Sequence, residues 1–235
     1  SGDGDITSWA ISPSLPNGLQ LGSTNGTVYG LPSGLLNTTE FTVWANNSGG
    51  SSSTTFNLTV VDQVPTMAYS PSNLTFVRDE TSSQLPLEAT VVGAGEFLTW
   101  TVSPPLSSGL SLNPSNGTLS GIPSTNASLT SYTITATNSG GNRTFVLNIT
   151  VLEPLAVLSY ASLNLTRNLT MTPLSPTQSG GVPAQWGLSP SLPAGLSFAN
   201  GLFWGTPTVN MTTTTYTVWA NNSGGSASTT VDITV

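Results

Sequence analysis

The chain has 235 residues, of which 6% are charged, and its three basic and ten acidic residues give a formal net charge of −7. An average soluble domain is about a quarter charged, and this chain also has no His, no Cys and no Lys. These absences exclude imidazole bases, thiolate nucleophiles, lysine Schiff bases and His/Cys metal sites. The scarcity of basic residues argues against a nucleic-acid partner. No apolar run approaches the ~18 residues of a membrane span. We therefore expect a protein that is not an enzyme and has no cofactor.

Residues 1–61 read as short strands separated by Asn-Gly, Leu-Pro and Ser-Gly-Gly turns. In residues 41–46, Phe41 and Val43 face one side of the predicted strand while Trp44 faces the other, because side chains alternate with a period of two. Good helix formers are scarce, whereas Thr and Val suit a pleated surface. The pattern predicts β-strands and no helix.

The same pattern returns twice along the chain. "SWAISPSLPNGL" at 8–19 recurs as "TWTVSPPLSSGL" and "QWGLSPSLPAGL", so that Trp9, Trp100 and Trp186 mark a period of about 90 residues. A period of this length corresponds to a small domain. We predict three tandem immunoglobulin-like β-sandwich domains, with bounds 1–61, 62–152 and 153–235.

The second and third copies begin with a segment that the first copy lacks. "MAYSPSNLTF" at 67–76 matches "LSYASLNLTR" at 158–167, with Tyr69 corresponding to Tyr160. The first domain is therefore expected to lack its N-terminal strands, about two at typical lengths. Two interpretations stay open: the sequence starts within a repeat, or a neighbouring subunit donates the strands.

The recurring motifs resemble those of a known family. Trp-x-Ile/Val/Leu-Ser-Pro-x-Leu-x-x-Gly-Leu is followed by Asn-Gly-Thr-x-x-Gly-x-Pro and by Tyr/Phe-Thr-Val/Ile-x-Ala-x-Asn-Ser-Gly-Gly. In this order they resemble the immunoglobulin-like (He-PIG, cadherin-like) repeats of bacterial and archaeal surface proteins, over the whole chain. The resemblance implies the fold and, less specifically, a place in a stalk, adhesin arm or surface layer, because a fold does not fix a function.

N-glycosylation sequons are the second strong signal. Of 19 Asn, 13 begin an Asn-x-Ser/Thr triplet without Pro, where chance predicts about six. These are Asn25, Asn37, Asn46, Asn57, Asn73, Asn116, Asn126, Asn142, Asn148, Asn164, Asn168, Asn210 and Asn221. Asn57 and Asn148 fall on the outward phase of their strands, where a bulky glycan projects into solvent. We expect most of the 13 to carry glycans.

Two groups of Trp differ in phase. Trp9, Trp100 and Trp186 are expected in the core or at its edge. Trp44 and Trp219 fall on the outward phase, so they are predicted to contact a glycan or a neighbouring subunit. Binding of a saccharide is the alternative for these two.

The acids are few and dispersed. Asp62 and Glu153 lie at the two domain junctions, "VDQVP" and "VLEPL", whose short Pro-containing sequences favour semi-rigid connections. Ca²⁺ takes six to eight oxygen ligands, so one acid at each junction gives weak support for a Ca²⁺-stiffened adhesin. Asp3 with Asp5, and Asp79 with Glu80, are sequence neighbours and give no glycosidase pair.

These features predict a secreted, N-glycosylated cell-surface protein, prokaryotic and more specifically archaeal. Its expected role is structural, in a filament, stalk or surface layer, with adhesion as a further role. Its expected partners are copies of itself, and strand complementation at the first domain is one route to assembly. The alternative is a carbohydrate- or cell-binding adhesin module that uses Trp44 and Trp219.

Overall fold

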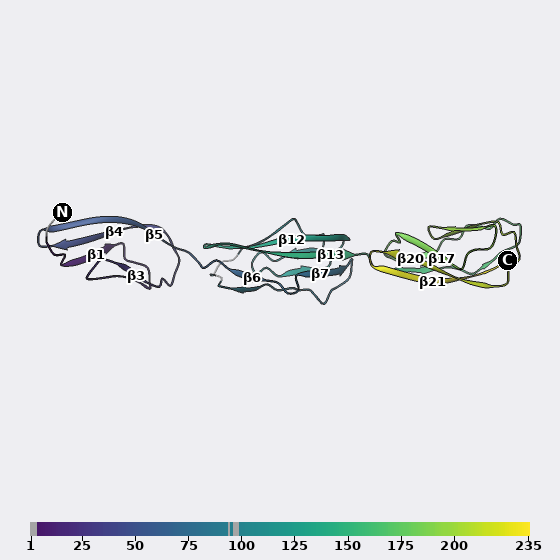
Figure 1. Ribbon diagram of the computed structural model, residues 1–235, viewed down its shortest axis with the longest axis horizontal. Helices are drawn as coiled ribbons and strands as arrows, with labels where there is room; N and C mark the ends of the chain where they lie inside the picture. The colour runs from purple at the N-terminus through teal and green to yellow at the C-terminus, as the bar shows by residue number, and fades with distance from the viewer. Residues whose placement is uncertain (1–3, 94, 96–98) are drawn as a thin grey trace. The chain divides into compact units, whose positions relative to one another are not determined.

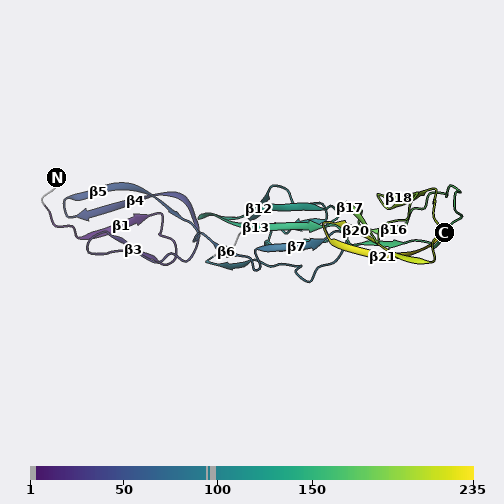
Figure 2. The same ribbon diagram turned by 45° about the vertical axis from the view of Figure 1, so that its right-hand side comes forward.

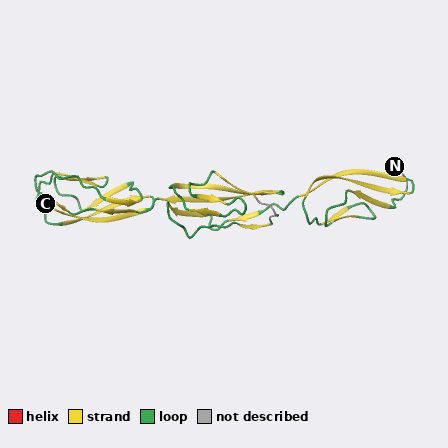
Figure 3. Ribbon diagram, turned by 180° about the vertical axis from the view of Figure 1, so that it is seen from behind, coloured by secondary structure: helices red, strands yellow, loops and turns green. Residues whose placement is uncertain are grey.

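A computed structural model describes residues 4–93, 95 and 99–235 of the chain. Within these residues the regular structure consists of strands joined by turns and loops, with no helix (Figure 3). The predicted all-β fold class is confirmed.

Strands follow one another in the same order in each repeat (Figure 1). The first repeat contains β1 (Ser8–Ser12), β2 (Leu19–Leu21), β3 (Val28–Gly30), β4 (Leu36–Asn47) and β5 (Gly50–Val60). The second contains β6 (Thr66–Ala68), β7 (Asn73–Val77), β8 (Thr90–Val92), β9 (Thr99–Ser103), β10 (Leu110–Leu112), β11 (Leu119–Gly121), β12 (Ala127–Asn138) and β13 (Gly141–Leu152). The third contains β14 (Ala156–Ser159), β15 (Leu163–Asn164), β16 (Thr177–Gly180), β17 (Gln185–Ser189), β18 (Leu196–Ala199), β19 (Leu202–Gly205), β20 (Thr214–Asn222) and β21 (Gly225–Thr234).

Backbone contacts divide the chain into two compact units. The first comprises Ser1–Ala68, Thr90–Trp100 and Thr135–Thr144, and the second comprises Tyr69–Ala89, Thr101–Ile134 and Phe145–Val235. The ends of β12 and β13 nearest their shared turn therefore group with the preceding linker, while the rest of these two strands belongs to the second unit.

The first unit holds the three-stranded sheet β1-β4-β5, in which β4 pairs antiparallel with both neighbours. Phe41 and Val43 of β4 are buried. Trp44, the next residue toward the β4–β5 turn, is half-buried. The predicted alternation is confirmed over residues 41–44, which gives this sheet one apolar face, whereas Ala45 and Asn46 are both half-buried.

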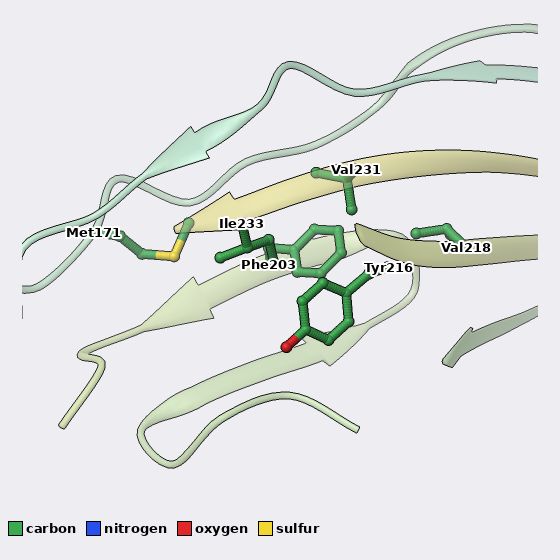
Figure 4. Packing of buried hydrophobic residues seen from close by; sticks show 6 residues of the cluster. All are labelled: Met171, Phe203, Tyr216, Val218, Val231 and Ile233. Carbon is green, nitrogen blue, oxygen red and sulfur yellow. The ribbon is translucent and has the colours of Figure 1, made fainter. Parts of the chain in front are cut away.

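The second unit holds the four-stranded sheet β15-β21-β20-β17. Its apolar face packs around six buried side chains (Figure 4), which are Met171, Phe203, Tyr216, Val218, Val231 and Ile233. Each is at most 8% exposed. Burying a large aliphatic or aromatic side chain stabilises the folded state by roughly 1.5–3 kcal/mol, so this cluster anchors the third repeat.

A parallel strand pairs with the last strand of each of the two later repeats. Leu74 of β7 lies opposite Ile149 of β13, and Leu163 of β15 lies opposite Ile233 of β21. The sequence match had aligned Leu74 with Leu165, and that alignment is wrong by two residues. Leu74 lies five residues after Tyr69, whereas Leu163, which occupies the equivalent ladder position, lies three residues after Tyr160; the strand is therefore displaced by two residues relative to the motif.

Among the residues that the structure describes, no parallel strand pairs with β5, which is the last strand in the sheet order β1-β4-β5 (Figure 2). Phe56 and Leu58 of β5 are half-buried, whereas their equivalents in β13, Leu147 and Ile149, are at most 1% exposed. The apolar face of the first sheet is therefore less completely covered than that of the second repeat.

The small hairpin of the first repeat is uncovered as well. Val28 of β3 is 36% exposed, whereas its equivalents Leu119 and Phe203 are fully buried. Leu87 bridges to Leu119 and Leu174 bridges to Phe203, and both bridging residues come from the segment that has no counterpart in the first repeat. Among the described residues, the hairpin of the first repeat therefore exposes an apolar side chain that the two later repeats bury.

Candidate functional site

The linker before the second repeat is held by the turn between β12 and β13. The Asp62 N–H donates to Ser139 Oγ at 2.8 Å, and the Ser139 hydroxyl donates to Asp62 Oδ2 at 2.7 Å. Asn138 Nδ2 donates to Gln63 O at 2.8 Å. Three hydrogen bonds therefore hold two successive linker residues against this turn.

The linker before the third repeat is held by the equivalent turn. The Glu153 N–H donates to Ser223 Oγ at 2.9 Å, and Asn222 Nδ2 donates to Pro154 O at 2.7 Å. In the second and third repeats, the Asn-Ser-Gly-Gly turn of the long hairpin therefore binds the linker that precedes the repeat. We call this arrangement of turn and linker the linker clasp.

Glu153 makes a further contact within the second unit. Arg78 Nη1 lies 3.0 Å from Glu153 Oε1, and the Arg78 N–H donates to Leu152 O at 2.9 Å. The Glu153 side chain is only 14% exposed, so this pair is less screened than a fully exposed one. Arg78 also contacts Asp79, whose side chain is mostly exposed.

The acids do not converge in the part of the chain that the structure describes. Within it, no group of three or more His, Cys, Asp or Glu is placed to hold a metal ion. Asp62 bonds to a serine and Glu153 to an arginine, while Asp5 and Glu80 are exposed. Asp3 lies outside the described residues. The Ca²⁺ expectation stays a prediction.

Most sequon asparagines face solvent. Ten are exposed: Asn25, Asn37, Asn57, Asn73, Asn116, Asn126, Asn142, Asn164, Asn168 and Asn210. The other three, Asn46, Asn148 and Asn221, are half-buried. The exposed set includes members from all three repeats, so no single patch of the surface carries them.

Two of the exposed sequons form Asx turns. Asn25 Oδ1 accepts from the N–H and the hydroxyl of Thr27, at 3.1 and 2.7 Å. Asn116 Oδ1 accepts from the Thr118 N–H at 3.0 Å. In both turns the side-chain oxygen is engaged, and the amide nitrogen, which is the atom that a glycan would occupy, is directed away from these bonds.

The half-buried Asn148 is engaged at both ends of its amide. Its Oδ1 accepts from Ser131 Oγ at 2.7 Å, and its Nδ2 donates to Asn73 Oδ1 at 2.9 Å. Sequence phase predicts an outward Asn148, but the parallel strand β7 brings Asn73 beside it. A glycan on Asn148 would compete with this cross-strand pair, whereas one on Asn73 would leave it intact.

The two outward Trp are flanked by small residues. Trp44 lies between Ala10 and Ser53 in the sheet, and Trp219 lies beside Gly187. Both Trp are half-buried. Two grooves of the described residues, at the β4–β5 turn and at the end of β21, are lined by other side chains. Contact with a glycan, a subunit or a saccharide therefore stays a prediction.

The other Trp set is in the core or at its edge, as predicted. Trp100 is 4% exposed. Trp9 and Trp186 are half-buried, and their rings lie against Gly26 and Gly201, where any side chain would overlap them.

Two tyrosine hydroxyls form equivalent contacts that the sequence did not reveal. The Tyr69 hydroxyl donates to Gly117 O at 2.6 Å, and the Tyr160 hydroxyl donates to Gly201 O at 2.7 Å. Burial raises the pKa of both hydroxyls, that of Tyr160 to about 12, since the charged form is poorly solvated there. The only available signal was the recurrence of Tyr at matching positions.

Among the residues that the structure describes, no helix is long and apolar enough to cross a membrane.

A comparison with curated proteins finds similarity to the "Serine-rich adhesin for platelets" of Staphylococcus aureus. The proteins of strains MRSA252 and MSSA476 are each 32% identical over 150 residues, or 61% of this chain. The match covers 10% and 6% of those two proteins, so the chain spans a tenth or less of their length.

A comparison with solved structures finds matches along almost the whole chain at low sequence identity. The eight N-terminal Ig domains of Down Syndrome Cell Adhesion Molecule cover 98% of this chain at 16% identity and a TM-score of 0.48, the match spanning 33% of that structure. A titin I-band fragment covers 97% at 18% identity and the same TM-score, and the match spans 86% of it.

A family model described as "Putative Ig domain" (He_PIG) matches residues 1–61, 65–152 and 154–235. Nearly the whole chain is covered by these three matches, which agree with the threefold recurrence of motifs and strands. The chain belongs to the He_PIG family of immunoglobulin-like domains.

Proposed function

We propose that this chain is part of an N-glycosylated, extracellular cell-surface protein of a prokaryote, specifically an archaeon, with a structural and adhesive role and no catalytic one. The observation that carries the proposal is the exposure of ten of the 13 sequon asparagines, distributed over all three repeats. The similarity to proteins named as adhesins supports the adhesive part.

Glycans would take over the role that charged side chains have on most protein surfaces, which is to resist association. Soluble domains commonly carry enough charge to resist association, whereas only 6% of these residues are charged. Bulky, hydrated sugars on exposed asparagines would keep strand edges and apolar side chains of neighbouring molecules apart.

Glycopeptide mass spectrometry of the protein from its native source tests this part. We expect sugar on the majority of the 13 sequons. The six asparagines outside sequons are the internal control and should be bare: Asn17, Asn47, Asn113, Asn138, Asn200 and Asn222. Bare asparagines at most sequons would refute the proposal.

We further propose that copies of the chain assemble by strand complementation at β5, as in a filament or stalk. The support is the edge position of β5 and the half-buried Phe56 and Leu58 on it. In the second repeat this position holds the parallel strand β7 with buried Leu74 and Phe76, and in the third it holds the parallel strand β15. A strand of the same alternating chemistry, supplied by a second copy, would cover the open face.

A proline on β5 tests the assembly. Asn148 N–H, in β13, donates to Ser72 O beside β7, so the equivalent N–H of Asn57 faces the open edge. Asn57→Pro removes that donor and leaves the β4 side of the ladder paired, since an edge strand tolerates Pro when its N–H faces solvent. Sedimentation and electron microscopy should show loss of assemblies for Asn57→Pro.

Asn57→Gln is the matched control, because it also removes the sequon but keeps the backbone donor. It should assemble like the unaltered chain. Equal assembly of Asn57→Pro would exclude β5 as the assembling edge.

A further inference from the structure

The groove at the β4–β5 turn of the first repeat lies where the linker clasp lies in the other two. It has a volume of about 680 Å³ and is lined by residues that include Asn47, Ser48, Gly49 and Gly50. We propose that it is a docking site for an extended acidic segment with the sequence chemistry of this chain's own linkers. The inference goes beyond the proposed function and depends on neither glycosylation nor assembly at β5.

The turn has the same internal geometry in all three repeats. In each, the first Gly N–H donates to Oδ1 of the Asn two residues before it, which fixes the Asn side chain and directs its Nδ2 outward. The distances are 2.9 Å for Gly49 to Asn47, 3.0 Å for Gly140 to Asn138 and 2.9 Å for Gly224 to Asn222. The groove is therefore preorganised for the same ligand.

The hydrogen-bonding groups that hold the linkers are available in the first repeat. Ser139 and Ser223 each accept a linker N–H, whereas the exposed Ser48 hydroxyl makes no hydrogen bond with any residue that the structure describes. Asn47 Nδ2 reaches only Gly4 O, at 3.3 Å, which is long for a hydrogen bond to a carbonyl. The Ser48 hydroxyl and Asn47 Nδ2 could therefore both bind a ligand without the loss of a strong hydrogen bond.

The glycines show where the ligand backbone would lie. A Cβ at Gly140 would overlap Asp62 O, and one at Gly224 would overlap Glu153 O. Among the described residues, the atom nearest to a Cβ at Gly49 would be Asn47 Oδ1, at 3.3 Å. The space that the linker carbonyl fills in the later repeats is thus open beside Gly49.

The second glycine of the turn faces the residue two places after the acid. A Cβ at Gly141 would lie 3.4 Å from the Val64 side chain, and one at Gly225 would lie 3.2 Å from the Leu155 side chain. No atom of the described residues lies within 4 Å of the Cβ position of Gly50. The ligand motif read from the two linkers is therefore acid–any residue–aliphatic, with the aliphatic side chain over Gly50.

Aspartate should be preferred over glutamate at the acidic position. Asp62 returns a hydrogen bond from the Ser139 hydroxyl to its own carboxylate, whereas Glu153 places its carboxylate on Arg78. The groove of the first repeat is lined by no Arg. The backbone N–H of an aspartate can therefore donate to Ser48 Oγ while its carboxylate accepts from the Ser48 hydroxyl. The longer glutamate side chain has no cationic partner in the groove.

An NMR titration tests the site with the full chain, produced without glycosylation. The probe is a synthetic peptide with the sequence of residues 59–66, TVVDQVPT. We expect saturating shifts of the Ser48, Gly49 and Gly50 amides, about tenfold weaker binding for the peptide TVVAQVPT because a charge-assisted hydrogen bond is lost, and intermediate binding for TVVEQVPT. Absent shifts, or equal affinity of the Ala peptide, would overturn the proposal.

Substitutions in the groove separate docking from nonspecific contact. Gly49→Ala fills the carbonyl space and Ser48→Ala removes the hydroxyl, so both should abolish the shifts while the remaining spectrum keeps its dispersion. Ser53→Ala, on β5 just outside the lining residues, is the matched control and should bind normally. Unchanged binding by Gly49→Ala would place the peptide elsewhere.

Disulfide trapping gives a result even if the affinity is low. The chain has no Cys, so Ser48→Cys supplies one thiol, which can attack the peptide TVVCQVPT activated as a mixed disulfide with thionitrobenzoate; the protein–peptide disulfide forms as the thionitrobenzoate thiolate leaves. We expect faster trapping than with Ser53→Cys. Equal trapping rates at the two positions would contradict the site.

Discussion

The tyrosine hydroxyl that bonds to an Asn-Gly turn is the residue-scale feature shared by the second and third repeats. Tyr69 and Tyr160 donate to Gly117 O and Gly201 O. Each bond ties the first strand segment of its repeat to a distant turn. A buried acceptor that loses its donor is costly, so these hydroxyls stabilise the repeats as well as position them.

We expect Tyr69→Phe to lower the free energy of unfolding by about 1–2 kcal/mol, because Gly117 O would lose its donor while the ring stays in place. Urea denaturation followed by circular dichroism measures the change. The exposed Tyr29, whose hydroxyl bonds to Gln20 near the surface, provides the control: Tyr29→Phe should be nearly neutral. Equal effects of the two substitutions would contradict the account.

Stability should also fall in alkali. The folded state holds the Tyr160 proton with a pKa raised from 10.0 to about 12, so deprotonation favours the unfolded state. The contribution is fully present below pH 10 and is lost as the pH rises through about 12. Urea denaturation across this range should show the decline, and Tyr160→Phe should reduce its slope. A stability curve that is flat to pH 12 would be inconsistent with the buried hydroxyl.

Two equivalent glycines differ in what surrounds them, and this gives a matched pair of substitutions. Gly140→Ala should destabilise the second repeat by about 1–3 kcal/mol, because its methyl group would overlap Asp62 O. Gly49→Ala should destabilise by less than about 1 kcal/mol, because among the described residues its methyl group would crowd only Asn47 Oδ1, at 3.3 Å, and a small shift of that side chain relieves the contact. Thermal denaturation compares them, and a reversed order would contradict the linker clasp.

At the scale of elements, the sequence predicted which segments form strands and which of their side chains point inward. It did not predict which strands pair with one another. The period-two pattern gave the inward Phe41 and Val43 correctly. It gave an outward Asn148 without showing that the parallel β7 brings Asn73 against it. Parallel pairing joins segments about 75 residues apart, and such contacts depend on tertiary packing rather than on local propensity.

The edge position of β5 predicts fast hydrogen exchange there. In β13 the backbone pairs on both sides, with β7 and β12, whereas β5 pairs only with β4. Local opening is easier where fewer buried contacts and backbone bonds must break. Peptides from residues 54–60 should exchange faster than those from 145–151 by hydrogen-exchange mass spectrometry of the unassembled chain. Similar protection of both would indicate that the edge is covered.

At the scale of the whole molecule, repetition was the feature the sequence showed most directly. Motifs that recur three times identify a family without any long-range information, and the family match bears this out. The linker clasp was not predictable, since Asn-Ser-Gly-Gly reads as an ordinary turn. Its role depends on a serine hydroxyl and an amide meeting a linker that is separated from them by about 70 residues in sequence.

The central claim is a glycosylated surface protein whose copies complement one another at β5. A density map of the native assembly tests it most directly. We predict a strand running parallel to β5 beside Phe56 and Leu58, and branched sugar density on most exposed sequon asparagines. A map with an unpaired β5 and bare asparagines would contradict the account.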